Sequence, residues 1–575
     1  MLRKALIGGL VALVLAGPAG AQRATKTLLM PGVTYSNEVQ FTPRGPISVH
    51  VITAPRPGGL YALRPALSNN MILGREKLTA IEKKTSPAAT LAGVNGDRFA
   101  VGGEPSSILI RSGVLDSPPL AQRSSIGVAA DGSLRVERVA YDGIWRGNGQ
   151  RRPLRLNQVP GGNGVSLFTP AWGPTTPQIA GVTEAVLPSL PPTTTGVELP
   201  SQVAQIGPTN GGTAIPPGGA VIVGRGTGGT KLAAEAPAGT PVTVRLTLTP
   251  SWGDVTDAIG GGPLLVRGGK PIFRANEMFS IEQLVPRSAR TAVGQLADGR
   301  IVLVAVDGGR LGYSVGMTSF ELALTLVRLG CVTGSALDGG NSTAMAFDGS
   351  LLGRPSGPSG EIPIGDALLV YYYGVYTPPP TVSVLSPNGD GVDETQTLRY
   401  KVVRASQVSA TLVGPDGAAR ALDSGARQPK TYRFDWDGKD PDGTPAPEGA
   451  WRLSVTATDD QGRTSTAERP FFLNTTLGFL TAPPTTVVRR GGSDLAASFT
   501  LAHPARAQVT LERGSGAIVR TLLRASLQAG PASVRWDGRD ANGVRASAGR
   551  YRLRVSATNE FGTVDLSRSV AVTRG

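Results

Sequence analysis

The sequence has almost no cysteine and almost no histidine. Cys331 is the single cysteine in 575 residues, so the chain can form no intramolecular disulfide and no zinc site built from several cysteines. The two histidines, His50 and His503, are too few for a histidine-rich metal centre. Cys331 lies among apolar residues in LVRLGCVTG, where a thiol is usually a small buried group rather than a nucleophile.

Long apolar runs are missing beyond the first residues. The opening MLRKALIGGLVALVLAGPAGAQ has two basic residues, an apolar run from Ala5 to Ala16 and small residues up to Ala21, the pattern of a secretory signal peptide. The apolar run is shorter than the roughly 20 residues that span a bilayer. We therefore expect residues 1–21 to be a signal peptide, the mature chain to have no transmembrane segment, and the protein to be secreted or to lie in the periplasm or cell envelope.

Dense basic clusters are missing too, although the formal net charge is +15. The basic residues are spread along the whole chain, which is not typical of a nucleic-acid-binding surface. We expect no nucleic acid partner. Dispersed positive charge favours long-range attraction to an anionic cell-envelope polymer instead.

An internal repeat is present in the last third of the chain. WDGKDPDGTPAPEGAWRLSVTAT begins at Trp436 and WDGRDANGVRASAGRYRLRVSAT begins 100 positions later at Trp536. Each copy has Gly/Asp turns before a strand that alternates apolar and polar residues, which predicts two immunoglobulin-like sandwiches without a disulfide. They resemble the immunoglobulin-like module of the bacterial flagellar-hook capping protein. We place the modules at residues 381–474 and 484–573, after a proline linker at residues 376–380.

The segment SPNGDGVDE opens the first predicted module. It offers Asn388, Asp390, Asp393 and Glu394 as calcium ligands, but their spacing departs from the EF-hand pattern of alternate positions. We favour a polar turn.

Residues 22–375 combine many short alternating segments with two helical ones, residues 75–84 and residues 318–330. The second is apolar nearly all round, which predicts a helix deep in the domain. The fold class expected for the whole chain is an α+β domain, with a mixed sheet and a few buried helices, followed by two all-β immunoglobulin-like sandwiches.

Polar loops follow several apolar strands of this region. Asp-Gly-Gly occurs at Asp307 and again at Asp338, and GVNGDRF places Asn95, Gly96 and Asp97 in a similar position. If the strands before Asp307 and Asp338 lie side by side, the two carboxylates meet at one edge of the sheet. Asp-Gly after a strand is also an ordinary turn, so a structural role for Asp307 or Asp97 stays open.

Residues 30–372 resemble the phosphodiester glycosidase family. The resemblance is carried by GVNGDRF, LNQVPGGNGVSLFTPAWG, AIGGGPLLVRGGK, RSARTAVGQLADGRIVLVAVDGGR, GYSVGMTSFELALTLVRLG and ALDGGNSTAMAFDG, in that order. The chain departs from the family at two loops: Asp97-Arg98 stands where the family usually has Gly-Phe, and Asn341 stands at a position that is usually glycine. These departures leave the identity of the sugar open.

The resemblance implies a hydrolase that cleaves a sugar from a phosphodiester in a glycan or cell-envelope polymer. Carboxylates that activate water and handle the proton are the usual means. The catalytic candidates are Asp338, Glu321 and Asp307, and the substrate-binding candidates are Asn95, Gly96, Asp97, Arg290, Gly339, Gly340, Asn341, Ser342 and Thr343. Arg290 is expected to hold the phosphate, the backbone of Gly339 and Gly340 with Ser342 and Thr343 to line an anion site, and Asn95 to bind sugar hydroxyls.

Alternatives remain for these roles. Arg290 can pair with a structural carboxylate, and Glu321 lies three residues after Thr318, the spacing of a helix-capping box. The sequence establishes no cofactor and leaves a divalent cation open. The alternative for the whole protein is a non-catalytic glycan-binding or envelope-scaffold protein with the same fold.

Overall fold

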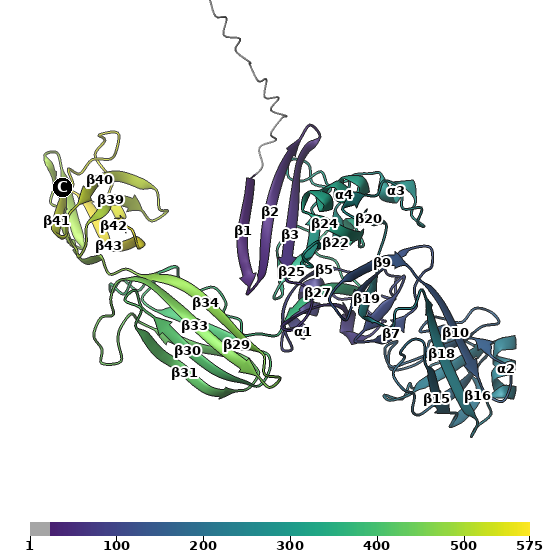
Figure 1. The fold of residues 1–575 in the computed structure, drawn as a ribbon. Coiled ribbons are helices and arrows are strands. Elements are labelled where there is room, and N and C mark those ends of the chain that lie inside the picture. Colours follow the sequence, from purple (N-terminus) through teal and green to yellow (C-terminus); the bar gives the residue numbers. More distant parts are fainter. Residues whose placement is uncertain (1–22) are drawn as a thin grey trace, which may run out of the picture. The chain divides into compact units, whose positions relative to one another are not determined.

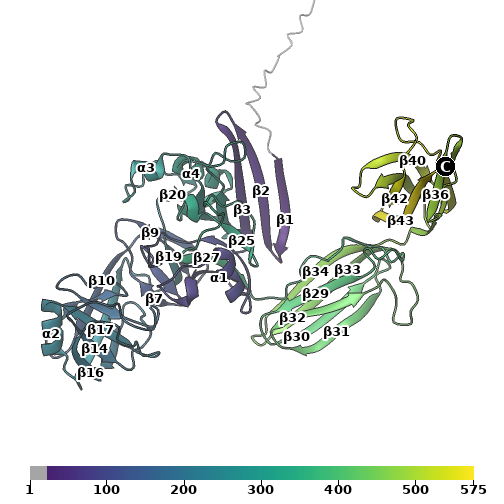
Figure 2. The same ribbon diagram turned by 180° about the vertical axis from the view of Figure 1, so that it is seen from behind.

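The computed structural model describes residues 23–575, so the predicted signal peptide lies outside the described residues. The chain divides into two units: unit 1 ends at Tyr373 and unit 2 comprises Gly374–Gly575. Figure 1 shows the fold and Figure 2 shows it from behind. No helix among residues 23–575 is long and apolar enough to cross a membrane.

The central feature of unit 1 is an eight-stranded sheet. In spatial order its strands are β1 (Arg23–Met30), β2 (Val33–Thr42), β3 (Gly45–Ala54), β23 (Ile301–Val306), β22 (Arg290–Leu296), β24 (Cys331–Ala336), β20 (Leu264–Arg267) and β21 (Lys270–Pro271). β23 reads IVLVAV and is buried throughout, because other layers cover both faces of the sheet at this strand.

Helix α4 (Ser319–Arg328) covers one face of this sheet, over β20, β22 and β24 (Figures 1 and 2). Its inner side, including Leu322 and Leu326, joins the core formed by β3, β22 and β23. Leu324 on its outer side is 45% exposed. The segment is therefore helical as predicted, but it lies on the sheet with one apolar side in solvent rather than deep in the domain.

Two further sheets of unit 1 flank the central one. The first contains β26 (Ser350–Leu351), β25 (Met345–Phe347), β5 (Thr90–Asn95), β27 (Asp366–Tyr372) and β4 (Tyr61–Leu67). Helix α1 (Leu78–Thr85), the other predicted helix, packs on one face of this sheet through Leu78 and Ile81. The second contains β7 (Val114–Ser117), β6 (Leu109–Arg111), β19 (Val255–Gly260), β8 (Ser124–Ala129) and β9 (Leu134–Arg138).

Residues 140–249 add two sheets that share one core with strands of the second flanking sheet. One contains β11 (Arg152–Pro153), β10 (Ala140–Arg146), β18 (Pro241–Thr249) and β15 (Glu198–Gln202), and the other contains β12 (Arg155–Leu156), β13 (Val165–Phe168), β17 (Ala220–Arg225), β14 (Val182–Leu187) and β16 (Gln205–Thr209). The remaining helices of unit 1 are α2 (Thr227–Glu235), α3 (Ile281–Leu284) and the short 3₁₀ turns η1 (Ser68–Asn70) and η2 (Gly340–Ser342).

Unit 2 contains the two predicted β-sandwiches, each with its own core. The first pairs β28 (Val384–Leu385), β34 (Thr464–Leu473), β33 (Gly449–Asp459), β30 (Ser406–Val413) and β31 (Ala419–Arg427) with β29 (Gln396–Val402) and β32 (Lys430–Trp436). The second pairs β35 (Leu477–Thr481), β38 (Ala496–Leu501) and β41 (Gly530–Arg535) with β37 (Gly492–Ser493), β36 (Thr485–Arg489), β43 (Gly562–Arg574), β42 (Gly549–Asn559), β39 (Ala505–Arg513) and β40 (Ile518–Leu527).

The repeated WDG loop has the same construction in both sandwiches. The indole N–H of Trp436 donates to the carbonyl of Lys439 at 2.7 Å, and that of Trp536 donates to Arg539 at 2.8 Å. Gly438 lies at φ 80° and its counterpart in the second sandwich at φ 78°, a left-handed conformation that favours glycine. The loop geometry has therefore been duplicated together with the sequence.

Candidate active site

The predicted carboxylates Asp307 and Asp338 lie at one edge of the eight-stranded sheet. Asp307 directly follows β23, Asp338 follows β24 after Leu337, and β22 begins at the same edge, with Arg290 opposite Val306. The strands before the two Asp-Gly-Gly loops are not side by side, because β22 lies between them, so the condition under which the two carboxylates would meet is not fulfilled. Two strand spacings, about 10 Å, therefore separate the loops.

Asp338 is the predicted residue whose environment best suits chemistry. Its carboxyl accepts hydrogen bonds from the Ser342 hydroxyl and the Gly339 N–H, and Arg98 Nε lies 3.6 Å from its Oδ1. The side chain is 16% exposed. Burial raises the pKa of Asp338, and the hydrogen bond from Ser342 and the charge of Arg98 lower it. Such opposing influences are typical of a proton-transfer group.

Arg98 and Phe279 complete these surroundings, and the sequence analysis did not assign either to the site. The guanidinium of Arg98 lies 5.5 Å from the centre of the Phe279 ring, and that of Arg123 lies 5.2 Å from it. The Arg98 side chain is 37% exposed, so its remaining N–H groups can meet a ligand beside Asp338. In the sequence, only the position of Arg98 within the GVNGDRF loop indicated that it belongs to the site.

Asp97 and Asp366 form a buried pair behind this surface. Asp97 forms an ion pair with Arg123, and its own N–H donates to Asp366 Oδ1 at 2.8 Å. Burial raises the pKa of Asp97, and burial together with the charge of Asp97 raises the pKa of Asp366 well above its ordinary value. A Cβ at Gly96 would fall 2.1 Å from Asp366 Oδ1, so glycine is required there for packing. This corrects the substrate-binding roles expected for Gly96 and Asp97, since neither has a free surface.

Asn95 has a structural role in place of the expected contact with sugar hydroxyls. Its side chain is buried; its Oδ1 accepts from the Thr291 hydroxyl at 2.7 Å and from the Ala344 N–H at 3.1 Å. Its Nδ2 donates to the Asp338 carbonyl at 2.8 Å. Asn95 therefore holds the Asp338 loop against β5 and β22 and positions the carboxyl.

The backbone that follows Asp338 is not an open anion site. The Gly340 N–H donates to the Ala289 carbonyl at 2.8 Å, and the Gly339 N–H is used by the carboxyl of Asp338. Thr343 is buried, and Asn341 is exposed on η2. This argues against the expected anion-binding concavity, because the Gly340 N–H has a protein acceptor and the Gly339 N–H lies beside the Asp338 carboxyl, whose negative charge repels an anion.

Arg290 is held by backbone carbonyls. Its Nε donates to Met317 at 3.0 Å, Nη1 to Gln283 at 2.7 Å, and Nη2 to Pro286 at 2.7 Å. Burial lowers the pKa of this guanidinium, and the charge of Arg98 lowers it further. The phosphate-binding role expected for Arg290 is corrected accordingly: it ties the α3 segment to the sheet edge, and Arg98 is the better placed cation.

Glu321 forms the capping box that the sequence left open as its alternative role. The Thr318 N–H donates to the Glu321 carboxyl at 2.9 Å, and the Glu321 N–H donates to the Thr318 hydroxyl at 3.1 Å. Its second carboxylate oxygen forms an ion pair with Arg287. Among the described residues no hydrogen bond or ion pair joins it to Asp338, so its expected catalytic role has no geometric support.

Asp307 belongs to a separate buried cluster around His50. Its Oδ2 lies 2.9 Å from His50 Nε2 and accepts from the Tyr313 hydroxyl at 2.7 Å. The Tyr35 hydroxyl lies 2.7 Å from His50 Nδ1, and burial, with the charge of Asp307, raises the pKa of Tyr35 to about 12. Sequence reasoning counted His50 only among the absences and missed this pairing, which joins residues 257 positions apart.

No metal centre is evident in the part of the chain that the structure describes. Residues 23–575 contain no group of three or more His, Cys, Asp or Glu side chains that could hold a metal ion. The segment at residues 386–394 forms a polar turn in which the N–H groups of Asp390 and Gly391 donate to Glu394.

Comparisons with known proteins agree with both resemblances seen in the sequence. Residues 196–371 match the family model of phosphodiester glycosidases, and residues 389–461 and 485–560 match that of the FlgD Ig-like domain. The first match includes Asp338, Asp307, Glu321 and Arg290, while Arg98 precedes it.

Individual relatives are similar over limited parts of the chain. The prophage-derived uncharacterized protein YomE of Bacillus subtilis is 34% identical over 95 residues, 16% of this chain and 14% of YomE, so the chain spans well under two thirds of this curated relative. A hypothetical protein from Synechocystis has a solved structure with a TM-score of 0.50 and 27% identity, covering 60% of this chain and 62% of that one. A putative exported protein of Burkholderia pseudomallei K96243 aligns with a TM-score of 0.52 and 19% identity over 64% of this chain and 100% of its own, which shows the shared fold.

Proposed function

We propose that unit 1 hydrolyses the bond between the anomeric carbon of a sugar and a phosphodiester oxygen, with Asp338 as the proton-transfer group. The observation that carries this proposal is the pairing of Asp338 with Arg98. Asp338 lies within the segment that matches the phosphodiester glycosidases, and it is a mostly buried carboxyl with a raised pKa that faces the partly exposed guanidinium of Arg98.

The chemistry assigns a task to each of the two groups. A phosphate monoester is a good leaving group, so protonating it matters less than activating water at an oxocarbenium-like transition state. Ionised Asp338 accepts a proton from water, the water oxygen bonds to the anomeric carbon, and the bond from that carbon to the phosphate oxygen breaks with its electron pair going to phosphate. Arg98 favours the ionised form of Asp338 and neutralises the phosphate with N–H groups that match its oxygens.

The supporting residues keep this pair in place. Asn95 fixes the main chain of Asp338. Arg123 forms an ion pair with Asp97 and packs on the Phe279 ring, and the same ring contacts the guanidinium of Arg98. A catalytic group supported in this way needs little reorganisation during the reaction.

The substrate that we propose is a glycan or cell-envelope polymer with sugar phosphodiesters, met by an exported protein. The net charge of +15 favours encounter with such anionic polymers. The two FlgD Ig-like domains would hold the enzyme at this material.

A substrate that reports on which side of the phosphorus the bond breaks tests the proposal. In a sugar 1-(4-nitrophenyl phosphate), glycosidic cleavage releases free sugar and 4-nitrophenyl phosphate, which turns yellow only after a phosphatase is added. Cleavage between phosphorus and the nitrophenyl oxygen gives colour at once. We expect delayed colour and free sugar with one anomer of glucose or N-acetylglucosamine. Immediate colour would overturn the proposal. The absence of product from both anomers of both sugars would also overturn it, and would favour the non-catalytic glycan-binding or scaffold alternative.

A further inference from the structure

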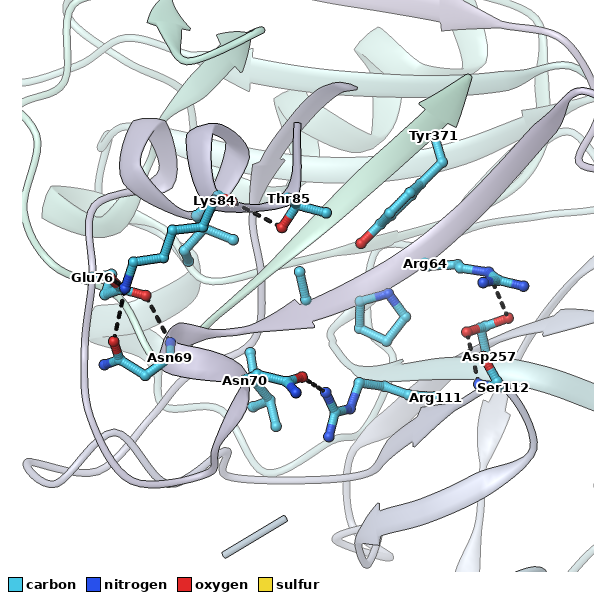
Figure 3. Close-up of a pocket in the computed structure, with 14 residues that line it drawn as sticks. Arg64, Asn69, Asn70, Glu76, Lys84, Thr85, Arg111, Ser112, Asp257 and Tyr371 are labelled. Carbon is cyan, nitrogen blue, oxygen red and sulfur yellow. Dashed lines mark hydrogen bonds and ion pairs between the residues drawn. The ribbon is translucent and has the colours of Figure 1, made fainter. Parts of the chain in front are cut away.

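A cavity of about 530 Å³ lies in unit 1 away from Asp338. Its lining comes from β4, η1, α1, β6, β19 and β27, with Tyr371 of β27 among the lining residues (Figure 3). Asp366, which belongs to the candidate active site, lies five residues earlier in the same strand. Because side chains alternate along a strand, Tyr371 and Asp366 point to opposite faces of the sheet. The cavity is therefore a separate site.

Charged side chains surround this cavity in pairs. Lys84 forms an ion pair with Glu76 on one side, and Arg64 faces Asp257 on the other (Figure 3). Arg111 donates to Asp116 at 2.6 Å. Since each cation has its own carboxylate, the lining holds no uncompensated charge for an ionic ligand. The remaining donors and acceptors suit a neutral, hydroxyl-rich one.

Two polar groups of the lining lack protein partners. Arg64 Nε lies 3.6 Å from Asp257 Oδ2, which is too far for a hydrogen bond, and it has no other acceptor among the described residues. The Tyr371 hydroxyl, whose pKa burial raises to about 12, has no hydrogen-bond partner in the described part of the protein and is directed toward the cavity (Figure 3). The buried Arg64 Nε gains most from a ligand that hydrogen-bonds it, and the Tyr371 hydroxyl can bond the same ligand.

Two consecutive asparagines at the cavity have left-handed backbones. Asn69 lies at φ 52° and Asn70 at φ 57°, a left-handed conformation that asparagine adopts more readily than other non-glycine residues. Lys84 holds the Asn69 side chain at 2.9 Å, and Arg111 donates to the Asn70 side chain. These contacts fix both asparagine side chains at the wall of the cavity.

A second cavity of about 500 Å³ shares Asn70 and Arg111 with the first. Its lining includes Leu190, the prolines Pro170, Pro191 and Pro192, and Thr193. Asn70 and Arg111 therefore lie where the two cavities meet, with a further set of apolar and hydroxyl groups beyond them. Such an arrangement fits an extended ligand made of several similar units, which would occupy both cavities.

We propose that these two cavities bind a neutral oligosaccharide, with Tyr371 and Arg64 in the first cavity and Asn70 and Arg111 at the junction. The C–H faces of a sugar pack on the tyrosine ring and the prolines, while its vicinal hydroxyls meet the paired Arg, Asn and Asp groups, whose planar ends can form two hydrogen bonds at once. The site would bind glycan independently of hydrolysis.

Calorimetric titration of the full chain tests this proposal. The probes are cello-, malto-, manno- and chitohexaose, with trigalacturonate as the anionic comparator. We expect at least one neutral hexasaccharide to bind, and Tyr371→Phe and Asn70→Gly each to weaken it by about 2- to 10-fold, the value of one lost hydrogen bond. Glycine adopts the left-handed backbone of Asn70 without steric cost, so loss of folding does not explain the result.

Two controls place the binding site. Asn276→Gly removes another asparagine with positive φ, 51°, from outside both cavities and should leave binding unchanged. Asp338→Asn should leave it unchanged as well. The proposal is overturned if no neutral probe binds, if trigalacturonate binds more tightly than all of them, or if Tyr371→Phe and Asn70→Gly bind as the wild type does.

Discussion

Replacing Asp366 by asparagine should make the protein more stable, by an amount that grows as the pH rises. Asp366 is fully buried and shares its surroundings with Asp97, whose charge Arg123 compensates. Burial and the neighbouring charge raise the pKa of Asp366 well above its ordinary value, so it holds its proton in the folded protein. Asparagine keeps the Oδ1 that accepts the Asp97 N–H. The substitution therefore removes an ionisation and retains a hydrogen bond.

The sign and the slope of the effect follow from linkage. A carboxyl with a raised folded pKa contributes its full stability below the unfolded pKa, about 3.9, and loses it as the pH rises toward the folded pKa. In that window the folded state binds one proton more than the unfolded state, so the free energy of unfolding of the wild type falls by about 1.4 kcal/mol per pH unit from this group. The asparagine side chain does not titrate, so the Asp366→Asn variant should gain on the wild type by the same slope.

Urea unfolding at pH 4.5, 5.5 and 6.5 measures this difference. Pulsed hydrogen exchange on peptides from β27 would restrict the observation to unit 1. Asp131→Asn is the matched control, because hydrogen bonds from Ser133 lower the pKa of that exposed carboxyl, so it stays ionised in both states above about pH 4.5 and its difference from the wild type should not change from pH 4.5 to 6.5. Parallel stabilities of the wild type and Asp366→Asn from pH 4.5 to 6.5 would refute the reasoning, since they require an ordinary pKa for Asp366.

Three further substitutions separate structural from catalytic residues. Arg290→Lys should lower the melting temperature and leave the Michaelis constant nearly unchanged, because one ammonium group cannot serve the carbonyls that Arg290 binds; a raised Michaelis constant at unchanged melting temperature would restore its phosphate role. Glu321→Gln should keep turnover within about threefold of wild type, a barrier change of about 0.7 kcal/mol, because glutamine still completes the capping box; a hundredfold loss would make Glu321 catalytic. Arg98→Met should move the limb of the pH–rate profile that belongs to Asp338 to higher pH, because Arg98 lowers that pKa; an unmoved limb would exclude their coupling.

Local patterns predicted the elements that depend on neighbouring residues. The alternation in WRLSVTAT and YRLRVSAT predicted the sandwich strands, and Thr318 followed three residues later by Glu321 predicted the helix start, because both patterns act within a few residues. The Asp-Gly-Gly loops were likewise located at the correct sheet edge.

Long-range partners could not be predicted in this way. Strand order is set by packing, and the position of β22 between β23 and β24 separated two loops that the sequence made look equivalent. His50 meets Asp307 across 257 positions. Asn95 and Arg290 looked like ligand-binding residues because their side chains can bind ligands. In the fold, backbone groups that no local pattern identifies use that capacity.

The most direct test of Asp338-assisted glycosidic cleavage is hydrolysis in ¹⁸O-labelled water, with the wild type and Asp338→Asn compared on the sugar 1-(4-nitrophenyl phosphate) that the wild type cleaves. We predict that the label enters the anomeric hydroxyl of the released sugar and not the phosphate, and that Asp338→Asn slows release by about 10² or more while the melting temperature stays close to that of wild type. Label in the phosphate would contradict cleavage at the anomeric carbon. Turnover of Asp338→Asn within about threefold of wild type would contradict the role of Asp338.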